Sequence, residues 1–276
     1  MSVEANAAFR VEVQGPDLPS HPGLYGAGEA RCHSDPAARR LESCYAHPSI
    51  GVVVSGRFDY RSPIGAAAAR PGVVLFGNAG EDFTYRYLDD AGVRRIVVAL
   101  DMGLMAEVAD DCRCKDAAFP VAGLRASRAA IPLYAAVRRL ACGRAPDEEA
   151  AVRLIAASFR ALSRTAAPMG RESPRVREVA ALIDAHPAEP LSLGEMAALA
   201  GLSRYHFIRA FHAATGETPR QYQIAARLRA AADRLMDTRE PITTIALDVG
   251  FNDISHFNAT FRRAFGASPR SFRPAV

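Results

Sequence analysis

The sequence predicts a two-domain α+β protein, in which a β-rich N-terminal part is followed by an all-helical C-terminal domain. Short β-type runs separated by turn residues fill residues 49–100. Beyond Asp101 the apolar residues recur at the spacing of amphipathic helices. Near the C-terminus a helix–turn–helix pattern occurs twice. We therefore expect domains at residues 1–165 and 174–276, joined by a linker at 166–173.

Composition and charge narrow the class of protein. The chain has 276 residues and a mass of 29.6 kDa, which is enough for two domains that each bury a core. It contains no apolar run of membrane-spanning length and no signal-peptide pattern, so we expect a cytoplasmic location without a membrane partner. The net charge of +4 comes mostly from residues 169–276, where 14 arginines face 11 acidic residues. This excess is consistent with a nucleic-acid partner but does not require one.

Five runs in the N-terminal part have the composition of β-strands. They are residues 49–56, 57–62, 72–77, 83–88 and 94–100. The turns between them contain Ser55-Gly56, Pro71-Gly72, Asn78-Ala79-Gly80 and Asp89-Asp90-Ala91-Gly92. Turn chemistry at this spacing predicts an antiparallel sandwich or barrel.

Two helices are expected between these strands and the linker, at residues 128–142 and 147–163. In the second helix Val152, Ile155 and Phe159 fall on one face. Such an apolar face either covers the sheet or pairs with a second copy of the chain, and the sequence leaves both open.

The C-terminal domain contains a duplicated unit. Residues 201–212 read GLSRYHFIRAFH and residues 250–262 read GFNDISHFNATFR. Phe207 and Phe257 lie 50 positions apart, and the same offset holds for Phe211, Gly216, Pro219 and Arg220. Upstream of the turn the offset is 49, so the second copy has one extra residue there.

Each copy predicts a helix, a tight turn and a second helix, at residues 192–213 and 241–264. Ser192 and Glu195 form a capping box at the start of the first copy. Gly201 and Gly250 stand in the turns, where a left-handed backbone is easiest for glycine. Ser203 and Asp253 are expected to cap the second helices.

A helix–turn–helix with a glycine in its turn is typical of DNA-binding proteins, although one copy alone can equally be an ordinary helical hairpin. Two copies favour DNA binding. A linking helix at residues 219–236, about 27 Å long, can hold two groove-reading helices about one DNA turn, or 34 Å, apart.

These residues carry a family resemblance. LSLGEMAALAGLSRYHFIRAFHAATGETPRQY, the linking-helix motif ARLRAA and PITTIALDVGFNDISHFNATFRRAFGASPRSFR resemble the DNA-binding domain of AraC/XylS-type transcriptional regulators. HPSIGVVVSGRFDYRS and RPGVVLFGNAGEDFTYR are similar to the family's cupin-like effector domain. The resemblance implies a sequence-specific regulator of double-stranded DNA, controlled by a small-molecule effector bound in an N-terminal barrel. It also makes RNA polymerase a candidate partner and a homodimer a candidate assembly.

The outward face of the first reading helix carries Arg204, Tyr205, Ile208, Arg209 and His212. The resemblance places base contacts at Tyr205, Ile208 and Arg209. The guanidinium of Arg209 can bond both acceptors of a guanine, a contact that discriminates by about 1–3 kcal/mol. The expected base-contacting residues are Arg204, Tyr205, Ile208, Arg209, Ile254, Ser255 and Asn258.

The second reading helix is expected to bind mainly the DNA backbone, because Ala259 stands where the family commonly has a basic residue. Thr243 and Thr244 lie near a helix N-terminus, where free N–H groups favour phosphate. The expected phosphate contacts are Thr243, Thr244, Arg220, Arg262, Arg263 and Arg270. For each arginine the alternative is a solvated surface position. His206 and His256 are expected to pack or to form hydrogen bonds.

The resemblance also implies an effector pocket in the N-terminal domain. The candidate lining residues, all on or beside predicted strands, are His47, Tyr60, Phe76, Phe83 and Tyr85. Because alternate residues of a strand face opposite sides, the sequence leaves open which of them face the pocket.

The signatures of an enzyme are missing from the sequence. His47 stands alone among the strands, whereas metal-dependent cupins use clustered His and carboxylate ligands. Cys112 and Cys114 are too closely spaced for a usual zinc site. Five cysteines favour reduced thiols over a disulfide framework. We therefore expect no enzyme activity, no metal and no cofactor; the alternatives are a cupin-type enzyme or a thiol or metal sensor with an attached DNA-binding domain.

Overall fold

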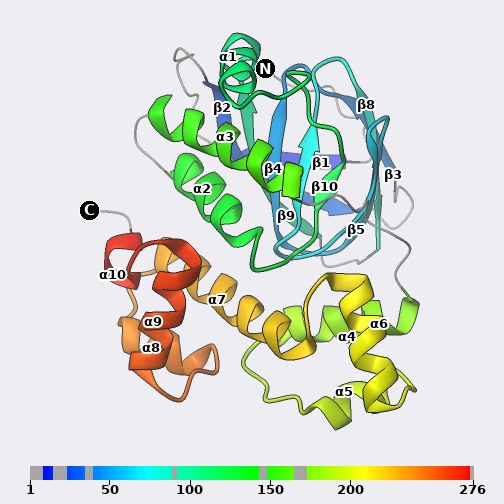
Figure 1. Cartoon of the computed structure of the whole chain (residues 1–276), viewed down its shortest axis with the longest axis vertical. Helices are drawn as coiled ribbons and strands as arrows, with labels where there is room; N and C mark the ends of the chain where they lie inside the picture. Colours follow the sequence, from blue (N-terminus) through cyan, green and yellow to red (C-terminus); the bar gives the residue numbers. More distant parts are fainter. Residues whose placement is uncertain are drawn as a thin grey trace. The chain divides into compact units, whose positions relative to one another are not determined.

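A computed structural model describes residues 9–14, 24–34, 40–88, 92–142, 148–164 and 173–273 (Figure 1). The chain forms two compact units. The first unit is Met1–Leu124 with Ala136–Met169, and the second is Arg125–Ala135 with Gly170–Val276. The expected linker lies outside the described residues, except for Ser173 at the N-cap of the first helix of the second unit. No helix in the described ranges is long and apolar enough to cross a membrane.

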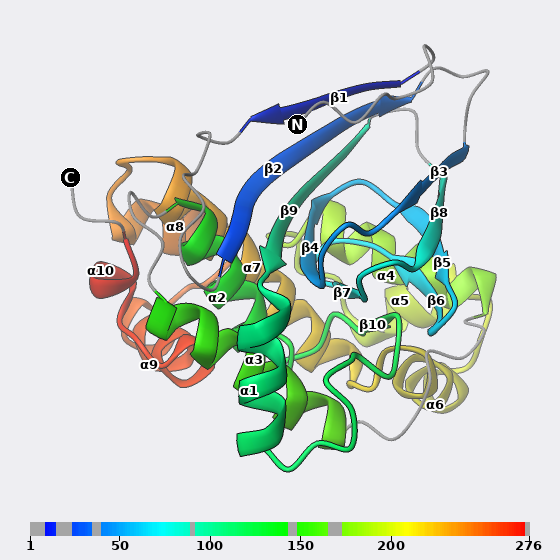
Figure 2. The same cartoon turned by 90° about the horizontal axis from the view of Figure 1, so that it is seen from above.

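The first unit contains two antiparallel sheets (Figure 2). The six-stranded sheet has the order β1 (Phe9–Gln14), β2 (Leu24–Ser34), β9 (Val93–Leu100), β4 (Ser49–Ser55), β7 (Val74–Gly77), β10 (Gly123–Leu124). The four-stranded sheet has the order β3 (Arg40–Cys44), β8 (Asp82–Tyr87), β5 (Phe58–Ser62), β6 (Gly65–Ala69). The five predicted strands are confirmed as β4, β5, β7, β8 and β9.

The sequence left an antiparallel sandwich or a cupin-like barrel open, and for the residues that the structure describes the barrel is not closed. Their strands form two separate sheets, and no strand is shared between the two ladders. The apolar pattern of each strand fixes which face is buried, but a barrel and a two-sheet sandwich both satisfy that pattern. Long-range strand pairing therefore decides between them.

The core of the first unit lies on and between these sheets. β4 is central in its sheet, and its Ile50, Val52 and Val53 are fully buried. On the other sheet the ring of Tyr85 packs edge-on against Phe58, with centroids 4.9 Å apart, and stacks on Tyr60 at 5.3 Å. Aromatic pairs at these distances add stability beyond the area they bury.

Three helices follow the strands: α1 (Met102–Asp111), α2 (Ile131–Cys142) and α3 (Glu148–Arg164). The last two were predicted, and α1, which Asp101 caps by accepting from the Leu104 N–H, was not. The buried face of α3 includes Phe159, whose ring lies 5.8 Å from Phe119. Phe119 in turn packs 4.7 Å from Phe76 of β7, so this apolar face is buried within the chain.

The second unit is helical. Its elements are α4 (Pro174–Ala185), α5 (Leu193–Leu199), α6 (Arg204–Thr215), α7 (Pro219–Asp237), α8 (Ile242–Asp248), α9 (Ile254–Phe265) and α10 (Pro269–Phe272). The predicted capping box is confirmed: Ser192 accepts from the Glu195 N–H, and the Glu195 carboxylate accepts from the Ser192 N–H. Ser203 and Asp253 cap α6 and α9. These local bonds satisfy N–H groups that a helix start leaves without partners.

The duplication is preserved in the packing of the aromatic side chains. In the first copy Phe211 lies 5.3 Å from Phe207 and meets Tyr222 edge-on at 5.4 Å. In the second copy Phe261 lies 5.5 Å from Phe257 and meets Phe272 edge-on at 5.3 Å. Figure 1 shows α4–α6 at one end of α7 and α8–α10 at the other. Two equivalent cores therefore flank one linking helix.

Residues 125–135 belong to the second unit, although the sequence placed them in the N-terminal domain. The Arg125 guanidinium donates to the carbonyl of Ala213 in α6 at 2.9 Å. The Arg128 N–H donates to the Glu217 carboxylate at 2.5 Å. Apolar packing adds to these bonds, since Ile131 is buried in the same cluster as residues of α7 and α8. We call residues 125–135 the strap.

Tyr134 is the polar residue of the strap whose side chain is buried. It is 1% exposed, and its hydroxyl donates to both carboxylate oxygens of Asp233, at 2.9 and 3.0 Å. Tyr134→Phe should lower the free energy of unfolding of the second unit by about 2 kcal/mol, because a hydrogen bond to a charged group is lost. The measurement is urea unfolding of the full chain followed by circular dichroism. Tyr205→Phe, at a residue 65% exposed, is the control and should change stability by less than about 0.5 kcal/mol; equal effects of the two changes would contradict this role of the strap.

Candidate functional site

The two predicted reading helices, α6 and α9, each bury one face and leave the other open. The buried faces hold Phe207 and Phe211 in α6, and Phe257 and Phe261 in α9, all with no exposed surface. The opposite faces carry the residues predicted to contact bases. Because both buried faces pack in the same way, each outer face is presented by a rigid support.

On the outer face of α6, Tyr205 and Arg209 form a pair. The Arg209 guanidinium lies 5.8 Å from the centre of the Tyr205 ring, and its Nη1 is 3.4 Å from the tyrosine hydroxyl. Both side chains are exposed, while Ile208 beside them is half-buried. Arg204, also exposed, lies against Gly194 of α5, where a side chain on residue 194 would approach its guanidinium to 3.2 Å. This face therefore offers a cationic fork next to an aromatic ring.

The histidines of the two copies have structural partners, as predicted. The Nδ1 of His206 lies 2.9 Å from the hydroxyl of Ser203, the residue that caps α6. The ring of His256 packs 5.7 Å from Phe251. Each imidazole is thus held by a neighbouring residue of its own copy.

The outer face of α9 is less polar. Ser255, Asn258 and Ala259 are exposed. Ile254 is only partly available, because it packs against the hydrophobic core of the second unit. The Asn258 amide can pair with both N6 and N7 of an adenine, and the Ser255 hydroxyl can donate or accept a single bond.

The residues predicted to contact phosphate lie at helix ends. Thr243 and Thr244 are exposed in the first turn of α8, and Arg220 and Arg270 are exposed in the first turns of α7 and α10. Arg262 and Arg263 are exposed in the last turn of α9. All of these side chains can reach solvent, so their charges and hydroxyl groups are available to a polyanion.

Two other arginines of α7 are bonded within the protein, Arg234 half-buried and Arg227 buried. Arg234 bonds to the carboxylates of Glu240 and Asp248. The hydrogen bond from Arg234 holds the pKa of Glu240 below its ordinary value. Arg227 is 7% exposed and bonds to three backbone carbonyls. No local pattern in the sequence marks either residue, because the groups that bury Arg227 lie 40 residues before it and 23 residues after it.

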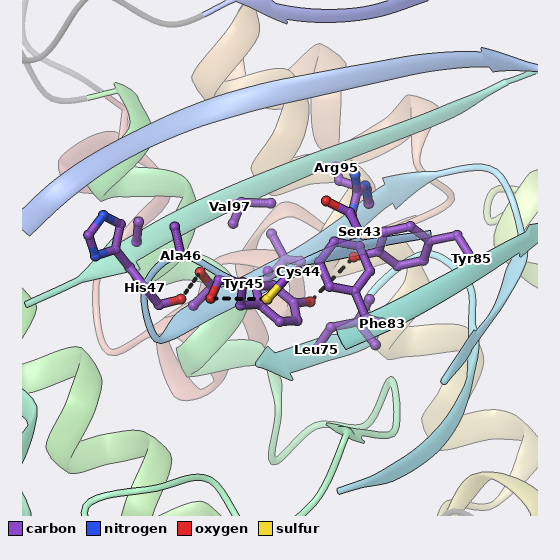
Figure 3. A pocket seen from close by; sticks show the side chains of 14 residues that line it. Ser43, Cys44, Tyr45, Ala46, His47, Leu75, Phe83, Tyr85, Arg95 and Val97 are labelled. Carbon is purple, nitrogen blue, oxygen red and sulfur yellow. Dashed lines mark hydrogen bonds between the residues drawn. The ribbon is translucent and has the colours of Figure 1, made fainter. Parts of the chain in front are cut away.

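A cavity of about 280 Å³ lies in the first unit, with walls from both sheets (Figure 3). Of the predicted effector residues, His47, Phe83 and Tyr85 line it. His47 lies at the opposite end of the cavity from Tyr85 (Figure 3). Cys44, Tyr45 and Arg95 also line the cavity and were not predicted. The ring of Tyr45 fits there because Gly77 has no side chain; a Cβ on residue 77 would come within 2.2 Å of the ring.

Tyr60 and Phe76 were predicted to line the pocket but lie behind its walls. Both are fully buried, and the Tyr60 hydroxyl donates to the Phe76 carbonyl at 2.9 Å. Leu75 lines the cavity, and its neighbour Phe76 points to the opposite face of the sheet, toward Phe119. The alternation of side chains along β7 is the physical reason.

Tyr45 of the cavity and Tyr60 behind its wall are uncharged. Burial raises the pKa of Tyr45 well above its ordinary value and that of Tyr60 to about 12, so both hydroxyls are neutral. Burial and the nearby Asp82 raise the pKa of Cys44, which keeps it a thiol. The Arg95 guanidinium lies 4.3 Å from the centre of the Tyr85 ring. In the described part of the chain, no group of three His, Cys, Asp or Glu side chains is placed to hold a metal ion.

Two further cysteines, Cys112 and Cys114, are free thiols as well and lie on the turn after α1. Burial, with a smaller contribution from Cys112, raises the pKa of Cys114. A thiol whose pKa is raised is a poor nucleophile at neutral pH.

Comparisons with known proteins find similarity in the second unit. Residues 196–275 match the family model of a helix-turn-helix domain. The regulatory protein SoxS of Escherichia coli strain K12 is 34% identical over 98 residues, which are 36% of this chain and 92% of SoxS. The HTH-type transcriptional regulator ArgR of Pseudomonas aeruginosa is 33% identical over 105 residues, which are 38% of this chain and 32% of ArgR. The solved DNA-binding domain of AdpA, in complex with a target DNA, has 32% identity and a TM-score of 0.35, over 37% of this chain and 91% of that domain.

Proposed function

The chain belongs to the AraC family of transcriptional regulators, and we propose that it binds specific operator sites through α6 and α9, which enter successive major grooves. The observation that carries the proposal is the pair of equivalent aromatic cores at the two ends of α7, each presenting an open helix face. α7 has 19 residues and is therefore about 28 Å long. A spacer of that length suits two helices that read one face of a duplex.

The two faces have different roles in this proposal. α6 supplies most of the base discrimination, through Arg209 on guanine with Tyr205 and Ile208 beside it. α9 contributes fewer base contacts, through Asn258 and Ser255 with Ile254 beside them, and otherwise holds the DNA backbone. The arginines at the helix ends add affinity without sequence information, because phosphates are the same at every base pair.

We further propose that a small effector binds in the cavity of the first unit. The cavity of about 280 Å³ is just below the usual range of small-molecule sites, roughly 300–1,000 Å³. Its neutral Tyr45 hydroxyl and the Arg95 guanidinium suit a compact ligand that has an apolar body and one acceptor or anionic group.

Two arginine variants test the DNA-binding roles. Preferred sites are first selected by the wild-type full chain from a randomised duplex library. Arg209→Ala should reduce the ratio of specific to random binding by about 5- to 150-fold, equivalent to 1–3 kcal/mol. Arg262→Ala should weaken both kinds of duplex alike and reduce the salt slope by about one.

The pair of variants separates two failures. An unchanged ratio for Arg209→Ala would show that the base-reading assignment is wrong. If the wild-type chain selects no sequence at all, the proposal of an operator-binding regulator fails as a whole.

A further inference from the structure

Arg227 lies on α7 between the two helix–turn–helix copies and is buried by both. We call α4–α6 the first module and α8–α10 the second module. The Nε of Arg227 donates to the carbonyl of Pro187 at 2.8 Å, and Nη2 lies 3.4 Å from the carbonyl of Ala188; both belong to the loop between α4 and α5. Nη1 donates to the carbonyl of Gly250 at 2.6 Å, in the turn between α8 and α9. One guanidinium therefore joins the two modules.

The modules also touch directly at this place. Gly250 has a φ of +95°, and a Cβ on it would lie 2.9 Å from the carbonyl oxygen of Ala188 and 2.9 Å from the Arg227 guanidinium. The turn of the second module is thus packed against the loop of the first. Gln223, one turn earlier on α7 and 2% exposed, donates to the Glu189 carbonyl at 2.8 Å and fixes the same loop.

The matching place in the first copy is built differently. Gly201, the counterpart of Gly250, faces the guanidinium of Arg175, which is an exposed residue of α4 in the same module. Both turn glycines are thus backed by an arginine. In the second copy that arginine is buried and bonds to carbonyls of both modules. The difference between the copies indicates a function beyond packing one helix–turn–helix.

We propose that Arg227 is a positioning residue that fixes the spacing and rotation of α9 relative to α6 on DNA. This inference rests on the proposed function. α7 sets the distance between the modules, and each module is held at its own end of α7, the first through Asp184 and the second through Glu240 and Asp248. The carbonyl bonds of Arg227 instead join the two modules to one another. The planar guanidinium reaches the three carbonyls from three separate nitrogens, Nε, Nη1 and Nη2, whereas the donors of a lysine ammonium all radiate from one nitrogen and do not span both modules in this way.

The rise and rotation of each base pair along DNA provide a test of the role of Arg227. One inserted base pair moves two half-sites apart by about 3.4 Å and rotates them by about 35°. A rigid pair of reading helices rejects such a change, whereas a hinged pair tolerates it. We expect the wild-type full chain to bind its selected two-part site at least about tenfold more tightly than the same site with one base pair inserted or deleted between the halves.

The experiment compares this spacing penalty between variants. Arg227→Lys and Arg227→Gln should reduce the penalty to about two- to threefold, while the order of preference within each half-site stays as in the wild type. The penalty is a ratio of affinities, so a variant that is partly unfolded lowers both affinities alike and leaves the ratio unchanged. Arg234→Gln is the matched control, because Arg234 lies on the same helix but bonds to Glu240 and Asp248 near the second module. It should keep the wild-type penalty.

Each outcome has a distinct meaning. A wild-type penalty in both Arg227 variants would overturn the proposal, because the arginine would then have no effect on spacing. An equal loss in Arg234→Gln would also overturn it, since any loosening of α7 would suffice. A wild-type chain that shows no two-part site contradicts the proposed function, which separates that failure from failure of the Arg227 assignment.

Discussion

Asp184→Ala is expected to lower the free energy of unfolding of the second unit by about 3–5 kcal/mol. The Asp184 side chain is 2% exposed, and that of its ion-pair partner Arg229 is 5% exposed. Arg229 donates to one carboxylate oxygen at 2.8 Å, and the Tyr222 hydroxyl donates to the other at 2.7 Å. Burial lowers the pKa of Arg229, but the Asp184 carboxylate, together with Tyr222, Tyr134 and Glu217, raises the pKa above the ordinary value. Removing the carboxylate leaves a buried positive charge without its main partner.

The location of this pair explains why the effect should be large. Asp184 lies in α4, whereas Arg229 and Tyr222 lie on α7, so the pair joins the first module to the linking helix. The measurement is urea unfolding of the full chain, with hydrogen exchange of peptides from α4 and α7 to assign the loss to the second unit. Asp248→Ala is the control, because that side chain is 52% exposed in its pair with Arg234 and should contribute less than about 1 kcal/mol. A loss below about 1 kcal/mol for Asp184→Ala would contradict the importance of the buried pair.

Gly250→Ala is expected to lower the free energy of unfolding by about 3 kcal/mol. A left-handed residue with a Cβ costs about 1–2 kcal/mol on its own. The added methyl group would also lie 2.9 Å from the backbone carbonyl of Ala188 and from Arg227, so the turn or the loop has to move. The measurement is the midpoint and slope of urea unfolding, since a change in midpoint at constant slope reports stability.

Gly266→Ala separates the two causes. Gly266 has a φ of +71°, but a Cβ on it meets nothing within 4 Å. It should therefore lose only the backbone contribution, about 1 kcal/mol. Equal losses at Gly250 and Gly266 would show that close packing at the module junction contributes nothing.

Local signals in the sequence identified most of the second unit. The starts of three helices are predicted by capping residues whose hydrogen bonds span three residues, namely Ser192 with Glu195, Ser203 and Asp253. The inward phenylalanines follow from helical spacing and are fully buried. Such features depend on residues within one or two turns of each other, so a sequence pattern is enough to predict them.

The first unit was less predictable. Strands with strong apolar runs were found, but β1, β2, β3, β6 and β10 were not. Residues of β6 are GAAAA, which lack the β-branched side chains of typical strands. Such a strand is defined by the partner with which it pairs, here β5. The lining of the cavity is equally hard to predict, because Leu75 and Phe76 exchange roles if the register of β7 shifts by one residue.

The sequence by itself determined the duplicated helix–turn–helix, its caps and its aromatic cores, because capping bonds and helical periodicity are properties of neighbouring residues. The tertiary structure alone decided that the strap packs with the second unit, that the strands form two sheets, and that Arg227 is buried between the modules. The physical reason is that these features are stabilised by contacts between residues that lie far apart in the sequence. Arg227 bonds to carbonyls 40 residues before it and 23 residues after it, and a buried charge is stable only where such distant backbone groups meet.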